Sequence, residues 1–311
     1  MGAAVMRPTG SVNRLVKRSK IIWSIPLRIR DSVKQRGQLG AVHSSFLVGC
    51  KRMNNLSIVR LNRYPIKGLS SEPMRTVTLR TGEGIPGDRL FGFARYNSGF
   101  DMQNPMPLPK DRFVVLLNEA ALAGIQTNFE IESQALEINA NGKTRRFDMR
   151  ESEDREKAAE FLSSEIDLKD PELPKFVSAA PHRFTDVSVV SPQMMNAISV
   201  LNLASVKKLG ERLNAEVHPA RFRANIEIDG LPSFAELDAV GSVLRFGDVE
   251  LKILSRTKRC AATEVNPKTA ERDLKIPYLI RKLMGHMDMG VYVEVVNGGT
   301  LTVGQTGEIL A

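Results

Sequence analysis

The chain has 311 residues, of which 42% are hydrophobic and 25% charged, and this composition excludes collagen-like, low-complexity and wholly disordered proteins. No run approaches the roughly 18 consecutive apolar residues of a membrane-spanning helix. The two cysteines, Cys50 and Cys260, cannot form a disulfide framework or a four-thiolate iron–sulfur or zinc site. We therefore expect a reduced, cytoplasmic protein of about two domains, without an integral membrane segment.

The positive charge of the chain is concentrated at its beginning. The formal net charge is +9, and residues 1–52 contain eleven Lys or Arg against one acid, Asp31, which leaves −1 for residues 53–311. A nucleic-acid-binding domain needs a basic surface, because neutralisation of phosphates supplies most of the non-specific affinity. The composition of 53–311 therefore argues against nucleic acid as a partner.

Residues 1–52 are open to three interpretations. The segment is rich in Arg, contains Ser and is poor in acids, like an organellar transit peptide, and it could also be a basic tail for anionic surfaces. The interpretation that we favour places the true start at Met53, where a β-like pattern begins. We expect a disordered leader in each case, and an organellar location only if it is a genuine transit peptide.

Residues 53–150 alternate short apolar runs with turn residues, which is typical of strands. The expected strands are Ser57–Leu61, Thr76–Arg80, Leu90–Ala94, Phe113–Leu117, Leu136–Ala140 and Thr144–Phe147. Asn141-Gly142 separates the last two and predicts a hairpin, because both residues tolerate positive φ. We interpret 53–150 as an N-terminal β-barrel module.

A helix and a connector are expected in residues 151–182. Acidic residues from Glu151 to Glu156 precede an apolar run that ends at Leu162, and acids in the first turn favour a helix. Pro171, Pro174 and Pro181 then indicate a connector between two halves of the protein.

Residues 183–311 combine short strands with two helices. The expected strands are Val187–Val190, Asn225–Ile228, Val243–Phe246, Val249–Leu254, Val291–Val296 and Thr300–Val303, and the expected helices are Asn202–Leu213 and Tyr278–Met284. Gly247-Asp248 predicts a tight hairpin. The fold class that we expect is β-rich α+β, with two β-barrel-like lobes and a few peripheral helices.

Several apparent motifs are rejected. The segment from Gly82 to Gly87 matches the dinucleotide-binding pattern, but Pro86 and a strand follow where a helix N-terminus is needed. The four histidines are too scattered in the sequence for a zinc site. The methionines from Met284 to Met289 are more typical of packing than of copper ligation.

Basic residues stand at turns and strand ends. Lys67 follows the rigid turn at Pro65, Arg89 opens a strand, and Arg223 and Asn225 share one face of a strand entry. Each alone is more often a solvated surface residue. Together, such cations could bind a phosphate.

One thiol follows a run of cations. Arg256, Lys258 and Arg259 lead directly into Cys260. A lone cysteine is more often a small buried apolar residue, but neighbouring cations favour the thiolate, which is the form that binds metals. The combination would suit a metal cofactor that carries a phosphate.

The order of these residues resembles the MOSC domain proteins, and in particular the two-part members with an N-terminal β-barrel module. That group includes the mitochondrial amidoxime-reducing components and their bacterial relatives. The matching segments follow the family order over most of 56–308 and are Tyr64-Pro65-Ile66-Lys67, Gly87-Asp88-Arg89, Phe222-Arg223-Ala224-Asn225-Ile226, Gly247-Asp248-Val249-Glu250-Leu251, Arg259-Cys260-Ala261-Ala262-Thr263 and Gly299-Thr300-Leu301-Thr302-Val303-Gly304.

The resemblance implies the molybdenum cofactor (Mo-molybdopterin), with Cys260 as the metal ligand and catalytic residue. Lys67, Arg89 and Arg223 would bind the pterin phosphate. The cofactor-binding residues that it implies are Lys67, Arg89, Asp186, Ser188, Arg223, Asn225, Arg259 and Thr263. The resemblance also implies pyridoxal phosphate binding, which is associated with the family.

The sequence departs from the family pattern at several positions. Gly68 stands where a small hydroxyl residue is usual, Ala224 replaces a proline, and Thr257-Lys258 replace the Cys-Ser before Arg259. Asp101-Met102-Gln103 stand in place of an Ala-Arg-Gln loop over the cofactor. We therefore expect the substrate entrance to differ from that of the family.

The resemblance implies an oxidoreductase that reduces small N-hydroxylated or N-oxide-type substrates. Because two cysteines cannot ligate an iron–sulfur cluster, the electrons are expected from a separate partner protein with a flavin, haem or iron–sulfur centre. The alternative is a non-catalytic molybdopterin or sulfur carrier in which Cys260 holds a persulfide or docks the cofactor. A nucleic-acid-binding module based on residues 1–52 is the least favoured hypothesis.

Overall fold

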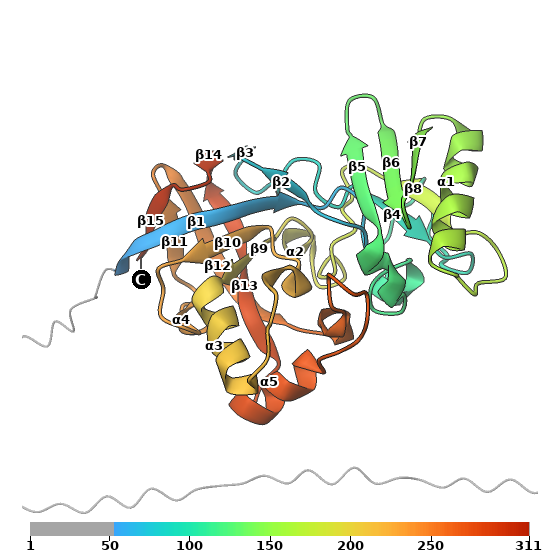
Figure 1. Cartoon of the computed structure of the whole chain (residues 1–311). Helices are drawn as coiled ribbons and strands as arrows, with labels where there is room; N and C mark the ends of the chain where they lie inside the picture. Colours follow the sequence, from blue (N-terminus) through green and yellow to red (C-terminus); the bar gives the residue numbers. More distant parts are fainter. Residues whose placement is uncertain (1–52, 311) are drawn as a thin grey trace, which may run out of the picture. The chain divides into compact units, whose positions relative to one another are not determined.

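The computed structural model describes residues 53–310 (Figure 1). The expectations about the leader concern residues 1–52, which lie outside the described residues. Within 53–310, no helix combines the length and the apolar composition needed to cross a membrane.

Seven strands close into a barrel. Strand β1 (Met53–Arg63) pairs with β10 (Ile226–Asp229) on one side and with β15 (Thr306–Leu310) on the other. Between β10 and β15 the order is β9 (Ile198–Asn202), β13 (Asp288–Asn297), β12 (Val249–Lys258) and β11 (Val243–Phe246). All neighbours are antiparallel except β9 and β10. The barrel thus joins a strand near residue 60 to strands of the second half.

Alternate residues of the barrel strands form its core. On β12, Val249, Leu251 and Ile253 are buried in one cluster with the alternating valines of β13. This period of two is what a strand with one face in a core requires. Burial of each such side chain contributes about 1.5–3 kcal/mol to stability.

Helices cover one end of the barrel. Helix α3 (Leu203–Leu213) and helix α5 (Ile276–Met284) bury Val206, Leu209 and Ile280 in a shared apolar cluster. The Asn202 side chain accepts a hydrogen bond from the Ala204 N–H, which caps α3 at its start. The shorter helices of this half are α2 (Pro192–Met195), α4 (Ala235–Asp238), η3 (Pro219–Phe222) and η4 (Ala261–Glu264).

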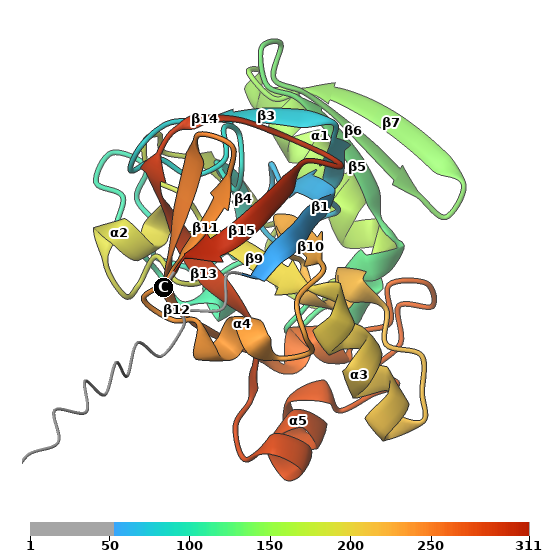
Figure 2. The same ribbon diagram turned by 90° about the vertical axis from the view of Figure 1, so that its left-hand side faces the viewer.

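A second core lies in the first half of the chain. The sheet β5–β6–β7 (Gln126–Glu130, Ala135–Ala140, Lys143–Asp148), the pair β4 (Phe91–Ala94) and β8 (Lys175–Ser178), and helix α1 (Ser152–Glu165) surround it. Its centre is aromatic, with the Phe91 and Phe176 rings stacked at 5.4 Å between centroids. The remaining short elements of this half are β2 (Glu72–Met74), β3 (Thr76–Leu79), η1 (Lys110–Arg112) and η2 (Ala120–Gly124); β3 packs in the barrel core and η2 in the second core. Figure 2 shows β3 beside β14 (Gly299–Thr302).

The β-rich fold class with few helices is confirmed, and so are both predicted hairpins. Asn141 and Gly142 have φ of 51° and 77° between β6 and β7, and Gly247 has φ of 61° between β11 and β12. The three long helices also lie where the sequence predicts them, although the helix expected to begin at Tyr278 begins at Ile276. Gly82 to Gly87 forms turns that lead towards β4, so the rejection of a dinucleotide site agrees with the structure.

Two predicted strands are wrong. In Phe113–Leu117 only Phe113 makes a β-bridge, and a turn follows, because the apolar side chains serve two cores instead of one strand face. Val187–Val190 is a turn with the Val190 N–H bonded to the Val187 carbonyl, and Val190 is 68% exposed. The high β-propensity of valine does not determine the structure here, because the chain turns at these residues.

Several strands were not predicted, namely β2, β5, β8, β9 and β15. Strand β8 lies within the expected Pro-rich connector and pairs with β4. Strand β9 runs directly into α3 at Asn202, and its five residues are all buried. A fully buried strand has no alternating pattern, which explains why it was missed.

Candidate functional site

A cavity of about 470 Å³ lies between the barrel and three segments of the first half, at residues 67–68, 89 and 110–117. It is lined by all of the sequence-predicted site residues except Ser188, namely Lys67, Arg89, Asp186, Arg223, Asn225, Arg259, Cys260 and Thr263. Ser188 is buried behind the lining, where its hydroxyl donates to the Thr185 carbonyl at 2.8 Å. Asp101-Met102-Gln103, the expected counterpart of the loop over the cofactor, does not line the cavity.

Cys260 stands where the long strand β12 ends and the turn η4 begins. Its backbone is extended, and its carbonyl accepts hydrogen bonds from the N–H and the hydroxyl of Thr263 at 3.0 and 2.9 Å. The turn therefore holds the half-buried Cys260 side chain at the cavity. Because the Thr263 hydroxyl is used in this turn, Thr263 positions Cys260.

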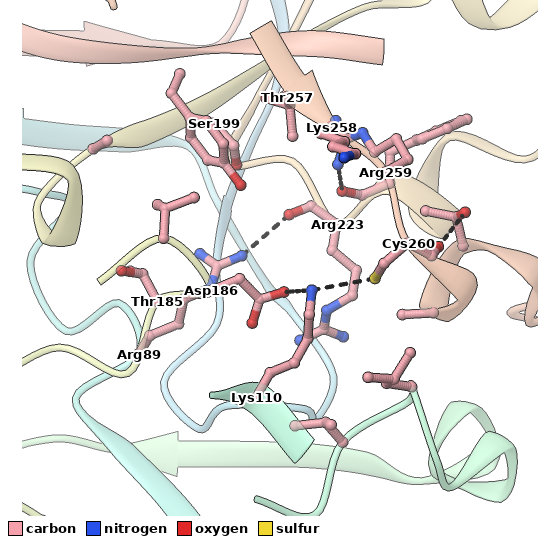
Figure 3. Close-up of a pocket in the computed structure, with 18 of the residues that line it drawn as sticks. Arg89, Lys110, Thr185, Asp186, Ser199, Arg223, Thr257, Lys258, Arg259 and Cys260 are labelled. Atoms are coloured by element: carbon pink, nitrogen blue, oxygen red, sulfur yellow. Dashed lines mark hydrogen bonds and ion pairs between the residues drawn. The ribbon is translucent and has the colours of Figure 1, made fainter. Parts of the chain in front are cut away.

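A chain of polar contacts leads from the sulfur of Cys260 to a buried lysine. Lys110 Nζ lies 3.2 Å from Cys260 Sγ and 3.0 Å from Asp186 Oδ2 (Figure 3). Lys67 Nζ donates to Asp186 Oδ1 at 2.6 Å. Lys67 also donates to the Phe184 carbonyl at 2.8 Å. One carboxylate thus binds two ammonium groups.

The charged groups in this row of contacts shift one another's pKa values. Burial alone raises the pKa of Asp186, but the two lysines outweigh it and hold that pKa well below its ordinary range. Burial lowers the pKa of Lys110, but Asp186 and Cys260 outweigh it and the pKa of Lys110 is raised. For Lys67 burial is the stronger effect, and its pKa is lowered despite Asp186.

Arg89 and Asn225 belong to a buried network around Asp88. The Asp88 carboxylate accepts from the Tyr64 N–H at 2.8 Å, from Asn225 Nδ2 at 3.0 Å and from Arg89. Asn225 also donates to the Asn62 carbonyl and accepts from Ser199 Oγ at 2.8 Å. All polar atoms of the Asn225 amide are therefore used within the protein, and its role is to position its neighbours.

The Arg223 guanidinium packs on an aromatic ring and has no hydrogen-bond acceptor among the described residues. It lies 4.4 Å from the centroid of the Tyr64 ring, and Arg89 lies 4.5 Å from the same centroid. Within the described residues, no acceptor is hydrogen-bonded to the Arg223 guanidinium, and burial lowers its pKa. Its backbone is left-handed, with φ of 51°, at the end of η3. The donor fork of Arg223 is available to a ligand.

The cations beside Cys260 in the sequence do not surround its sulfur as expected. Arg256 donates to the Leu237 carbonyl and to Asp238, and Arg259 donates to the Met289 and Phe222 carbonyls at 2.7 and 2.9 Å. The hydrogen bond to the sulfur comes from Lys110 instead. Arg259 Nη2 and Thr257 Oγ1 are buried without a partner in the described part of the chain.

Sequence reasoning missed Lys110, Thr257 and the aromatic platform of Tyr64. Lys110 and Cys260 are 150 residues apart in the chain, so no local pattern pairs them. The only signal for Lys110 is its position directly after Pro105, Pro107 and Pro109, in a segment expected near the entrance. Tyr64 and Thr257 were noted as motif positions without a role.

The arrangement can bind an anion and present one thiol sulfur. Guanidinium and ammonium groups recognise phosphate by charge-assisted hydrogen bonds. Among residues 53–310, no group of three or more His, Cys, Asp or Glu side chains is arranged to hold a metal ion. Cys260 supplies a thiol, a soft donor, to the lining of this cavity.

Two family matches together span most of the chain. Residues 181–307 match the MOSC domain, and residues 55–180 match the MOSC N-terminal beta barrel domain.

Three relatives illustrate the similarity. Mitochondrial amidoxime-reducing component 1 of Mus musculus is 38% identical over 117 residues, which are 34% of this chain and 34% of the mouse protein. The Homo sapiens protein of the same name is 33% identical over 140 residues, 40% of this chain and 41% of that protein. Molybdenum cofactor sulfurase of Caenorhabditis elegans is 24% identical over 251 residues, 78% of this chain and 34% of the sulfurase. The matched regions span less than half of each relative.

A solved structure of the YUAD protein from Bacillus subtilis aligns with 83% of this chain and 97% of its own, at a TM-score of 0.39 and 15% identity.

Proposed function

Because the chain belongs to the MOSC domain family and also contains the MOSC N-terminal beta barrel domain, we propose that it binds a molybdenum cofactor at Cys260. We further propose that it reduces small N-hydroxylated or N-oxide-type substrates. The observation that carries the proposal is the cavity in which one half-buried thiol lies beside several cations.

The donor set fits a phosphate-bearing metal cofactor. Arg223 has an unused donor fork at the cavity, and Arg259 Nη2 and Thr257 Oγ1 are buried polar atoms that lack partners within 53–310. Unsatisfied buried donors are costly, at about 1–3 kcal/mol each, unless a ligand pairs with them. Cys260 would hold the metal, and Arg223, Arg89 and Lys67 would hold the phosphate.

When bound, a molybdenum cofactor supplies two-electron transfer to or from an oxygenated atom. Two electrons and two protons convert an N–OH group into N–H and water, or an N-oxide into the amine and water. The residues of this chain have three tasks: Cys260 binds the cofactor, the cations orient its phosphate, and the Asp88 network fixes Arg89 and Asn225. The electrons come from a separate protein with a flavin, haem or iron–sulfur centre.

Two expectations receive no support from the site or the comparisons. Pyridoxal phosphate, a term carried by the family resemblance, is not part of this proposal. The cytoplasmic location stays a prediction, because the names of two relatives place those proteins in mitochondria. Residues 1–52, on which the organellar alternative depends, lie outside the described residues.

Metal analysis tests the proposal. We expect the wild-type chain, produced in a host that makes the cofactor, to contain molybdenum by mass spectrometry and to reduce benzamidoxime with a suitable electron donor. Cys260→Ser should lose the metal, whereas Cys50→Ser, which removes the other cysteine, should keep it. Equal molybdenum in Cys260→Ser and wild type would contradict the assignment of Cys260.

The second candidate is a non-catalytic carrier of molybdopterin or sulfur. Its support is the similarity to molybdenum cofactor sulfurase, which extends over 78% of this chain. In this case, the protein would retain a pterin or gain the mass of one sulfur atom at Cys260 as a persulfide. Bound pterin without electron-driven turnover of benzamidoxime would favour the carrier over the reductase.

A further inference from the structure

Lys110 brings a positive charge to the sulfur of Cys260 from the opposite side of the cavity. It begins the short helix η1, whereas Cys260 follows strand β12 of the barrel. Its Nζ carries three N–H groups, of which one meets Cys260 Sγ at 3.2 Å and one meets Asp186 at 3.0 Å. The third N–H has no acceptor among residues 53–310.

The accessibility of Lys110 separates it from the other cations of the site. The Lys110 side chain is 28% exposed, whereas the Lys67 side chain is 4% exposed beneath the shared carboxylate. A molecule that arrives from solvent at Cys260 therefore meets Lys110 before it meets Lys67.

The local charge balance leaves Lys110 attractive to anions. Asp186 is the only carboxylate bonded to Lys110 or Lys67 in the described structure, so two ammonium charges share one negative charge. Arg223, whose guanidinium has no hydrogen-bonded acceptor within 53–310, adds further positive charge at the same cavity, whereas Arg89 is paired with Asp88. An anion near the sulfur thus gains attraction without displacing an existing partner of Lys110.

We propose that Lys110 is a substrate-binding residue that makes this site select substrates with a negative charge on or beside the N–O oxygen, such as hydroxamate anions. The substrate class rests on the proposed reductase function, whereas the charge selectivity at Cys260 is independent of it. Lys110 donates its free N–H to the anionic oxygen as the oxygen approaches the sulfur. A neutral amidoxime lacks this ionic attraction.

Alkylation of Cys260 measures the charge selectivity without any cofactor. The full chain, produced in a host that lacks the cofactor, is treated with iodoacetate, which is anionic, or with iodoacetamide, which is neutral. Both reagents react with the same sulfur, so the ratio of their rates removes any change in the reactivity of the thiol itself. Mass spectrometry of the Cys260 peptide keeps Cys50 out of the measurement.

We expect Lys110→Met to lower the iodoacetate-to-iodoacetamide ratio about fivefold, the effect of one unit charge at about 4 Å in a water-like dielectric. Lys110→Arg keeps the charge and should keep the ratio. Lys258→Met is the matched control, because Lys258 is two residues from Cys260 in sequence and is not hydrogen-bonded to its sulfur within 53–310. Thermal melting of each variant checks that it is folded.

An unchanged ratio in Lys110→Met would overturn the proposal, as would an equal fall in Lys258→Met. An iodoacetate-to-iodoacetamide ratio that falls in Lys110→Met and stays at the wild-type value in Lys110→Arg would support the proposal. Should Lys110→Met fail to fold, Lys110→Gln takes its place, and the ratio retained by Lys110→Arg decides whether charge matters.

Steady-state kinetics of the cofactor-loaded protein test the substrate class. At a pH above the pKa of benzhydroxamic acid, where this substrate is the anion, we expect Lys110→Met to raise KM for benzhydroxamate about fivefold more than KM for neutral benzamidoxime. Equal changes for both substrates, or none, would overturn the substrate assignment. If the wild-type protein reduces neither compound, the reductase function fails, and the alkylation ratio alone decides the role of Lys110.

Discussion

Asn225 Nδ2 donates a hydrogen bond to Asp88 Oδ1 at 3.0 Å across 137 residues of sequence. The bond joins the entry of barrel strand β10 to the turn before β4. Because Asp88 also binds Arg89 and the Tyr64 N–H, a single carboxylate fixes two candidate cofactor residues and the aromatic platform. The site is thus a product of how the two halves meet.

This network predicts a large effect of Asp88→Asn. The substitution removes the negative charge that partners buried Arg89 and places an amide where three donors converge. We expect a loss of about 2–4 kcal/mol in the free energy of unfolding, measured with urea. Asp238→Asn removes an exposed ion pair with Arg256 and should cost less than about 1 kcal/mol. Similar losses at both positions would argue against a buried network.

The sequence motifs contain residues that line one cavity, but they do not indicate how those residues are arranged. Lys67, Arg89, Arg223 and Cys260 stand in local motifs, and all four line one cavity. Their distances depend on closure of the barrel through β1, β10 and β15, which are far apart in the chain. Short motifs record local geometry and contain no information about such pairings.

Hairpins and long helices were predictable because their signals are local. Asn141-Gly142 specifies its turn through two positive φ values, and α3 has an apolar face with a period that is independent of the rest of the fold. Val187–Val190 was mistaken for a strand because its valine-rich composition is typical of strands. The local sequence does not show that no strand lies beside it to pair with. The position of Lys110 after the prolines does not indicate its partners, because Asp186 and Cys260 are 76 and 150 residues away in the chain.

Arg223→Met should weaken anion binding without unfolding the protein. The Arg223 guanidinium has no acceptor among the described residues, and Met can replace its stem over the Tyr64 ring. We expect the cofactor-free variant to lose no more than about 1 kcal/mol of stability. The variant should need about tenfold more inorganic phosphate than the wild-type protein for the same rise in melting temperature. The reason is that one strong charged partner of the anion is lost.

Arg256→Met is the control for Arg223, since Arg256 bonds to Leu237 and Asp238 instead. Its melting temperature should rise with phosphate as in the wild-type protein. If Arg223→Met keeps the full phosphate response, Arg223 does not hold the anion.

Gly68 cannot be returned to the hydroxyl residue that the family resemblance leads one to expect. Its φ is +87°, and a Cβ at this position would lie 2.4 Å from the Val114 carbonyl oxygen. We expect Gly68→Ser and Gly68→Ala to cost about 3 kcal/mol or more, from the left-handed backbone and the clash together. Gly82→Ala has a similar φ of +73° but open space around the Cβ, and should cost about 1 kcal/mol. Equal costs would show that the clash with Val114 is relieved by a small movement.

Glu236 should make stability depend on pH. Burial raises its pKa, although Asn202 and Ser205 donate to its carboxylate and oppose the shift. Above about pH 4.3, the unfolded chain releases this proton before the folded protein does, so stability falls with rising pH until the raised pKa is passed.

Glu236→Gln removes that fall. The difference in free energy of unfolding, variant minus wild type, should therefore become more positive from about pH 4 to pH 8, by roughly 1.4 kcal/mol for each unit by which the pKa is raised. Exposed Glu160→Gln controls for the loss of one negative charge. A difference that stays constant over this range would mean that Glu236 does not titrate differently in the folded state.

Arg272 connects the turn of Cys260 to the opposite wall of the cavity. Its guanidinium donates to the Ala261 carbonyl at 2.7 Å and to the Leu116 and Leu117 carbonyls at 2.9 and 2.6 Å. Both walls belong to the cavity that contains Lys110 and Cys260. Loss of these bonds should make opening of the two walls easier by about 1–2 kcal/mol, because each contributes roughly 0.5–1.5 kcal/mol.

Hydrogen exchange on Arg272→Met tests this connection. The Asn118 and Thr263 amides, which bond to the Val115 and Cys260 carbonyls, should exchange about tenfold faster than in the wild-type protein. The Phe129 amide, bonded to Glu72 in the second core, should be unaffected. Arg256→Met removes another cavity-lining arginine, whose guanidinium bonds to the Leu237 carbonyl and Asp238, and should change the exchange of neither amide. Faster exchange at Asn118 alone would mean that Arg272 supports one wall and does not hold the two together.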